Sequence, residues 1–181
     1  LTLGTGVGGG IVLDGRVWRG AYSMAGEIGH VPIDLHGVRT STGRGGLEEY
    51  VGNAQIVRRA RRMLRHRPSM LPDMVGGNLR QLTPRHLAEA AQKGDDVARE
   101  VFDYMADCLA TALAGVTYLL QPEAFIIGGG VAAAGEVLFE PLRRHLNERL
   151  SPFFAKLIRV EPAALGNRGG MIGAAALVLR G

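Results

Sequence analysis

The sequence predicts an α/β domain in which a mixed sheet is flanked by helices. The first 20 residues alternate short apolar runs with glycine turns, which is typical of antiparallel hairpins. After residue 122 the order becomes strand, helix, strand, helix, which is typical of parallel strands joined by crossover helices. With 181 residues, 46% of them hydrophobic, the chain is long enough for one domain with a sizeable core.

The opening segment predicts two hairpins. The first apolar run breaks into the turn Gly4-Thr5-Gly6, and the strand that follows the next glycine run ends at the turn Asp14-Gly15. Glycines this dense allow backbone N–H groups to approach an anion closely, and the hydroxyl of Thr5 adds a donor. The first turn therefore fits either a phosphate-binding hairpin or an ordinary glycine hairpin.

The next segment places a carboxylate and an imidazole three residues apart. In a helical conformation Glu27 and His30 share one face, and together they offer an acceptor and a switchable donor that suit neighbouring sugar hydroxyls. The alternative is a helix-start carboxylate beside an ordinary hydrogen-bonded histidine. The polar residues 34–46 predict a loop.

The centre of the chain predicts three helices. Apolar spacing favours one helix from Leu47 to about His66, in whose first turn Glu48 is favoured by the helix dipole. Residues 68–77 are expected to form a loop. Thr83-Pro84 is an N-cap signal for a helix that Gly94 ends, and Asp95 caps a long helix that follows.

The last third predicts a strand over 124–127, a helix over 135–150, a strand over 157–160 and a helix over 170–179. The first of these reads as a buried strand, and Gly128-Gly129-Gly130 follow its carboxyl end. Ligands of open α/β sheets bind at that end, where glycine admits the flat face of a nucleotide. A tight strand-to-helix connection explains the same glycines.

Charge and cysteine content narrow the function classes. The net charge of +4 is concentrated in the arginine-rich run 58–67, which predicts a solvated helix face rather than a nucleic-acid surface, since no aromatic residues interleave. The single Cys108 lies in an apolar helical run and predicts a small buried hydrophobe in a reducing compartment. We expect a cytoplasmic protein that does not contact membranes.

Four segments resemble motifs of the ROK family of bacterial sugar kinases and repressors. Leu3–Ile11 is similar to its second phosphate motif, Gly26–His30 to its sugar signature, Gly45–Tyr50 to its Gly-Cys-Leu-Glu segment, and Ile126–Val131 to its adenosine-side motif. The order is preserved along the whole chain. The resemblance implies the actin/hexokinase/Hsp70-like (ribonuclease-H-like) ATPase fold, with residues 1–181 as the C-terminal lobe.

The resemblance also implies an activity and a set of site residues. By it, Glu27, His30 and Glu48 hydrogen-bond sugar hydroxyls, Gly4, Thr5 and Gly6 face the ATP phosphates, and Gly129 and Gly130 face the adenosine. The implied reaction is ATP- and Mg²⁺-dependent phosphorylation of a hexose, glucose first among them, at the 6-hydroxyl, by a homodimer. The alternatives are the sugar-sensing lobe of a transcriptional repressor and a non-catalytic fragment.

Two departures from the family pattern limit that implication. The family's zinc-binding cysteine positions read Arg39, Ser41 and Gly46, so we expect no structural zinc and some other means of ordering the 34–46 loop. The N-terminal lobe, which carries the catalytic Asp of the family, is absent from these residues. We therefore expect these 181 residues alone to be inactive, because phosphoryl transfer depends on that base.

Overall fold

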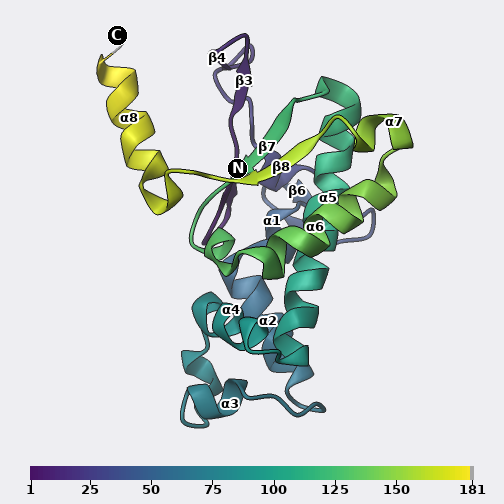
Figure 1. Ribbon diagram of the computed structural model, residues 1–181, viewed down its shortest axis with the longest axis vertical. Helices are drawn as coiled ribbons and strands as arrows, with labels where there is room; N and C mark the ends of the chain where they lie inside the picture. Colours follow the sequence, from purple (N-terminus) through teal and green to yellow (C-terminus); the bar gives the residue numbers. More distant parts are fainter. Residues whose placement is uncertain (180–181) are drawn as a thin grey trace.

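The computed structural model describes the backbone of residues 1–179 (Figure 1). Three short antiparallel hairpins and one parallel pair make up its strands. The hairpins are β1 (Thr2–Leu3) with β2 (Val7–Gly8), β3 (Ile11–Leu13) with β4 (Arg16–Trp18), and β5 (Arg39–Thr40) with β6 (Gly43–Arg44); the parallel pair is β7 (Ala124–Ile127) with β8 (Arg159–Pro162).

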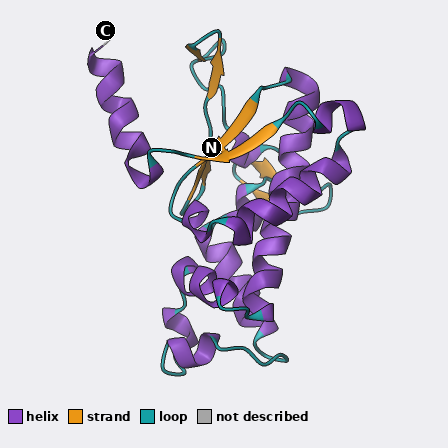
Figure 2. Ribbon diagram, in the orientation of Figure 1, coloured by secondary structure: helices purple, strands orange, loops and turns teal. Residues whose placement is uncertain are grey.

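Helices form the larger part of the molecule (Figure 2). They are α1 (Glu48–Val51), α2 (Asn53–Met63), α3 (Leu71–Met74), α4 (Pro84–Gln92), α5 (Asp96–Leu120), α6 (Glu136–Arg149), α7 (Pro152–Ala155) and α8 (Gly169–Leu179). Four 3₁₀ turns cover Ile28–His30, Leu79–Gln81, Val131–Ala134 and Gly166–Arg168.

Backbone hydrogen bonds join the first hairpin to the parallel pair. Leu3 N donates to Gly128 O at 2.9 Å, and Gly128 N donates to Leu1 O at 2.9 Å. A parallel bridge between Thr2 and Gly128 completes the contact. Strand β1 therefore lies between β2 and β7, which confirms the predicted mixed sheet and brings the glycine turn beside the glycines that follow β7.

The long helix α5 is the centre of the core. Its buried side chains run from Val97 to Thr117, and it packs against α2, α4 and α6. Asp95 caps its first turn, since Asp95 Oδ1 accepts from Ala98 N at 2.9 Å. The predicted cap of α4 is also present, as a reciprocal pair between Thr83 and His86. Cys108 is buried on α5, as expected, with 8% of its surface exposed.

The predicted helix from Leu47 to His66 is wrong in one respect, because it breaks at Gly52. Gly52 is extended, with φ −61° and ψ 154°, so the chain leaves the helix after Val51 and restarts at Asn53. Asn53 N then donates to Gly4 O at 3.0 Å instead of continuing the helical ladder. The apolar spacing continues across the break, which is why the pattern did not reveal it.

The structure differs from four other expectations. The predicted loops 68–77 and 34–46 contain the short helix α3 and the β5–β6 hairpin; α3 forms because fully buried Leu71 anchors it and Ser69 Oγ accepts from Leu71 N at 3.1 Å. The strand expected over 157–160 begins two residues later, at Arg159. The strand over 124–127, which we expected to be buried, is β7; only one of its faces is buried, since Ile126 on the other face is 49% exposed.

Some arginines of the basic run are structural. Arg61 Nε donates to Leu79 O at 2.8 Å, and the Arg59 guanidinium lies 3.5 Å from the centre of the Tyr104 ring. These contacts hold α2 against its neighbours, so the run is not uniformly the solvated face that the sequence predicted. Among residues 1–179, no helix is both long enough and apolar enough to cross a membrane.

Candidate functional site

The turn between β1 and β2 is held from both sides. Gly4 N donates to Gly6 O at 3.0 Å within the turn, and Thr5 is exposed at its tip. On one side Asn53 N donates to Gly4 O, and on the other Val7 N donates to Glu48 Oε2 at 2.8 Å. The glycine turn is thus fixed to the junction of α1 and α2, which is the structural reason for the break at Gly52.

The glycines after β7 lie against the same hairpin. Gly129 has φ +93°, and a Cβ placed there would overlap the backbone of Leu3, so this position requires glycine. Nothing lies within 4 Å of a Cβ placed on Gly4 or Gly130, so both face open space. A concavity of about 450 Å³ is lined by Thr2, Leu3, Gly4, Thr5, Gly6, Val7, Gly8, Glu48, Gly129 and Gly130.

Every residue that the sequence assigned to the nucleotide lines this concavity. Gly4, Thr5 and Gly6 come from the first hairpin, whereas Gly129 and Gly130 come from a segment more than 120 residues away. Backbone N–H groups and a Thr hydroxyl around an open space can bind an oxyanion. We call this feature the hairpin concavity.

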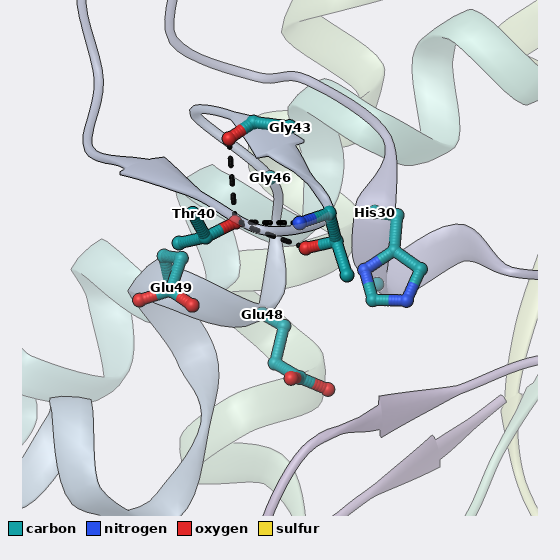
Figure 3. Close-up of a pocket in the computed structure, with 8 residues that line it drawn as sticks. His30, Thr40, Gly43, Gly46, Glu48 and Glu49 are labelled. Atoms are coloured by element: carbon teal, nitrogen blue, oxygen red, sulfur yellow. Dashed lines mark hydrogen bonds between the residues drawn. The ribbon is translucent and has the colours of Figure 1, made fainter.

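Of the residues assigned to a sugar, Glu48 borders the hairpin concavity, whereas Glu27 and His30 lie outside its lining. The 3₁₀ turn Ile28–His30 brings His30 Nε2 to 3.6 Å from Glu27 Oε2, and both side chains are partly exposed. His30 and Glu48 line a narrow cavity together with Gly29, Thr40, Thr42, Gly43, Gly46 and Glu49 (Figure 3). Glu27 lies beside His30 but outside that lining. We call this feature the threonine cavity.

The threonine cavity is only about 10 Å³, room for about one water molecule. A hexose therefore does not fit inside it, and the residues around it form one wall of a larger site. Their groups are a carboxylate pair, an imidazole and two hydroxyls, which suit a polyhydroxylated ligand.

Sequence reasoning missed Thr40 and Thr42. Thr40 Oγ1 lies 3.0 Å from Thr42 Oγ1 and donates to Gly43 O at 3.3 Å, which fixes the turn of the β5–β6 hairpin (Figure 3). The run Thr-Ser-Thr-Gly is a turn signal, so the hairpin could have been predicted from the sequence. The position of the hydroxyls beside His30 could not have been predicted, because only tertiary folding brings the two segments together.

Hydrogen bonds among protein groups order the 34–46 segment. Tyr50 donates through its hydroxyl to Asp34 Oδ2 at 2.8 Å, and His36 N donates to Asp34 Oδ1 at 2.9 Å. The Tyr50 hydrogen bond, with that of His36, lowers the pKa of Asp34, while burial and the same carboxylate raise the pKa of Tyr50 to about 12. Within residues 1–179, no three His, Cys, Asp or Glu side chains converge as metal ligands would.

Comparisons with known proteins match this chain over its whole length. The ROK family model matches residues 1–181. The chain belongs to the ROK family. A glucokinase of Thermotoga maritima is 36% identical over 179 residues, and a xylose repressor of Caldicellulosiruptor bescii is 28% identical over 184 residues. These alignments cover 98% and 99% of this chain and 56% and 45% of the relatives.

A solved structure is similar over almost the whole chain. It is a ROK family glucokinase from Streptomyces griseus in complex with glucose and AMPPNP, 33% identical, with a TM-score of 0.92 over 99% of this chain and 59% of that one. This ROK chain therefore has the actin/hexokinase-like ATPase fold that the sequence predicted. It spans little more than half the length of the glucokinases it matches.

Proposed function

We propose that the protein carrying this chain transfers the γ-phosphate of ATP to a hexose, with glucose as the first candidate and its 6-hydroxyl as the acceptor. The observation that carries the proposal is the juxtaposition of the two cavities, which meet at Glu48. Phosphoryl transfer requires the two reactants side by side. The kinase names of several relatives support the same assignment.

In this proposal the hairpin concavity binds the nucleotide. Gly4, Thr5 and Gly6 face the phosphates, with the Thr5 hydroxyl and the backbone of the turn as the donors; the N–H of Gly4 itself is used within the turn, where it donates to Gly6 O. Gly129 and Gly130 admit the adenosine. The open space at Gly4 and Gly130 fits that role. Mg²⁺ would supply charge neutralisation at the phosphates, where substrate phosphates, water and one or two carboxylates ordinarily hold it.

The sugar in turn lies against Glu27, His30 and Glu48, which accept and donate hydrogen bonds to its hydroxyls. Carboxylates that accept from hydroxyl groups fix the ring orientation and therefore the position of the attacking oxygen. The base that accepts the proton of that hydroxyl belongs, in this proposal, to a lobe outside these 181 residues. A homodimer in the cytoplasm remains part of the proposal.

The experiment is an ADP-release assay on the protein at its natural length, with Mg·ATP and a panel of hexoses. Glucose is expected to give the highest kcat/KM. His30→Ala should raise the KM for the hexose about tenfold, the effect of losing one hydrogen bond to a charged or polar partner. His36→Ala is the matched control, because His36 lines neither cavity, and it should change KM less than twofold.

A sugar-responsive regulator is the second candidate, because a xylose repressor is among the relatives. The intact glycine hairpin and Gly129-Gly130 favour the kinase, since sensing a sugar does not require a phosphate cradle. Hexose binding without ADP release from ATP would support the regulator and contradict the kinase proposal. Binding of neither ligand would support a non-catalytic role.

A further inference from the structure

Glu48 borders both cavities at once. It lines the hairpin concavity together with Gly4, Thr5 and Gly6, and it lines the threonine cavity together with His30. It does so from the first residue of α1, a four-residue helix whose C-terminal end is fixed by the break at Gly52. Figure 3 shows its carboxylate extending away from the β5–β6 hairpin.

The two oxygens of this carboxylate differ in their surroundings. Oε2 accepts from Val7 N at 2.8 Å, in the strand that leaves the glycine turn. Among the described residues, no donor is bonded to Oε1, which leaves that oxygen for a ligand. A Cβ placed on Gly6 would overlap the Glu48 carboxylate, so the glycine at this position is what allows the hydrogen bond to form.

The backbone next to Glu48 holds the other end of the same turn. Asn53 N donates to Gly4 O at 3.0 Å, and a Cβ placed on Gly52 would lie 3.0 Å from Thr5 O. The turn therefore contacts α1 and α2 at Gly4, Thr5 and Val7. The Glu48 side chain contacts this hairpin through the Val7 N hydrogen bond, which is short and directional, so a shift of the carboxylate strains or breaks it.

We propose that Glu48 is a positioning residue that couples the two sites, with Oε2 holding the phosphate-binding turn and Oε1 accepting a hydroxyl of the hexose. A bound hexose fixes the carboxylate, and the fixed carboxylate holds the turn in the conformation that receives the phosphates. Coupling between two sites is reciprocal, so the nucleotide strengthens hexose binding by the same factor. This inference rests on the proposed function and deepens it.

The test measures nucleotide affinity without any hexose, by calorimetry with a non-hydrolysable ATP analogue and the protein at its natural length. Glu48→Ala should weaken nucleotide binding about tenfold, because Val7 N loses a charged acceptor. Glu48→Gln keeps one acceptor oxygen for Val7 N and should recover most of that loss. Glu27→Ala, on the sugar side only, should weaken hexose binding and leave nucleotide affinity unchanged.

A second measurement uses the same proteins. In the wild type, saturating hexose should raise nucleotide affinity severalfold. This factor should fall toward one in Glu48→Gln, because an amide whose oxygen accepts from Val7 N presents an NH₂ donor, and no acceptor, to the sugar hydroxyl. Thermal unfolding of each variant shows whether it is folded; if Glu48→Ala is not, the Glu48→Gln coupling factor decides the question.

The outcomes separate this inference from the proposed function. Unchanged nucleotide affinity in folded Glu48→Ala, together with an unchanged coupling factor in Glu48→Gln, overturns the coupling role while leaving the kinase intact. Wild-type protein that binds neither ligand overturns both. Weaker nucleotide binding in Glu48→Ala but not in Glu27→Ala supports the coupling role, since a residue that only contacts the sugar would not produce it.

Discussion

Asp95 joins two segments through one carboxylate. Its Oδ1 accepts from Ala98 N at the start of α5, and its Oδ2 accepts from Met70 N at 2.8 Å, just before α3. Burial of this side chain opposes ionisation, but the hydrogen bonds that the carboxylate accepts, those from Ala98 N and Met70 N first among them, together outweigh burial and lower the pKa of Asp95. The sequence predicted the cap; the second bond is a tertiary contact.

We therefore expect Asp95→Ala to lower the free energy of unfolding by about 2–3 kcal/mol, the sum of a lost N-cap and an unpaired N–H. Asp95→Asn keeps one acceptor and should lose about half as much. Because the folded-state pKa is depressed, the contribution of the charge is present above about pH 4, the unfolded pKa, and is lost as pH falls through the folded value. Urea unfolding at pH 7 and pH 3 checks this. If the difference in the free energy of unfolding between the wild type and Asp95→Asn is as large at pH 3 as at pH 7, the prediction is wrong.

Cys108 should be unreactive in the folded protein. Burial raises the pKa of its thiol to about 11, and only 8% of the residue is exposed, so little thiolate is present or accessible at pH 7. A thiol reagent such as Ellman's reagent should modify it only after unfolding in denaturant. Stoichiometric modification of the native protein within minutes would contradict this burial.

At the scale of elements, hydrogen bonds among protein groups order the 34–46 segment. Tyr50→Phe removes the donor to Asp34 and should destabilise the segment, raising the pKa of Asp34 and lowering the free energy of unfolding by about 1 kcal/mol. Limited proteolysis should then cut within residues 34–46 faster than in the wild type. Equal cleavage rates would mean that the backbone bonds of the β5–β6 hairpin suffice.

Metal analysis tests whether the 34–46 segment binds zinc. Since Arg39, Ser41 and Gly46 carry no thiolate, the purified protein should contain well below one zinc per chain, and a chelator should not change its melting temperature. One tightly held zinc per chain would refute this expectation.

At the scale of the whole molecule, α8 stands away from the rest (Figure 1). No charged side chain occurs between Gly169 and Leu179, and Met171 and Ile172 are 71% and 43% exposed. An exposed apolar helix tends to bind other apolar surfaces, because contact with them removes its side chains from water. The 181-residue chain by itself should therefore bind a hydrophobic dye strongly. The variant Ile172→Lys should reduce the dye fluorescence, whereas Lys156→Ala, outside the helix, should not; equal fluorescence of all three proteins would contradict this.

The mixed α/β character and the helix caps at Thr83 and Asp95 could be predicted from the amino-acid sequence, because periodicity and capping depend on neighbours in the chain. The glycines and the residues Glu27, His30 and Glu48 were found through motifs that resemble those of a known family. The break at Gly52, the one-sided burial of β7, the hydroxyls of Thr40 and Thr42, and the placement of Glu48 between two cavities became visible only in the folded chain. Each of these depends on contacts between segments ten or more residues apart, or on which face another element covers, and no local pattern encodes them.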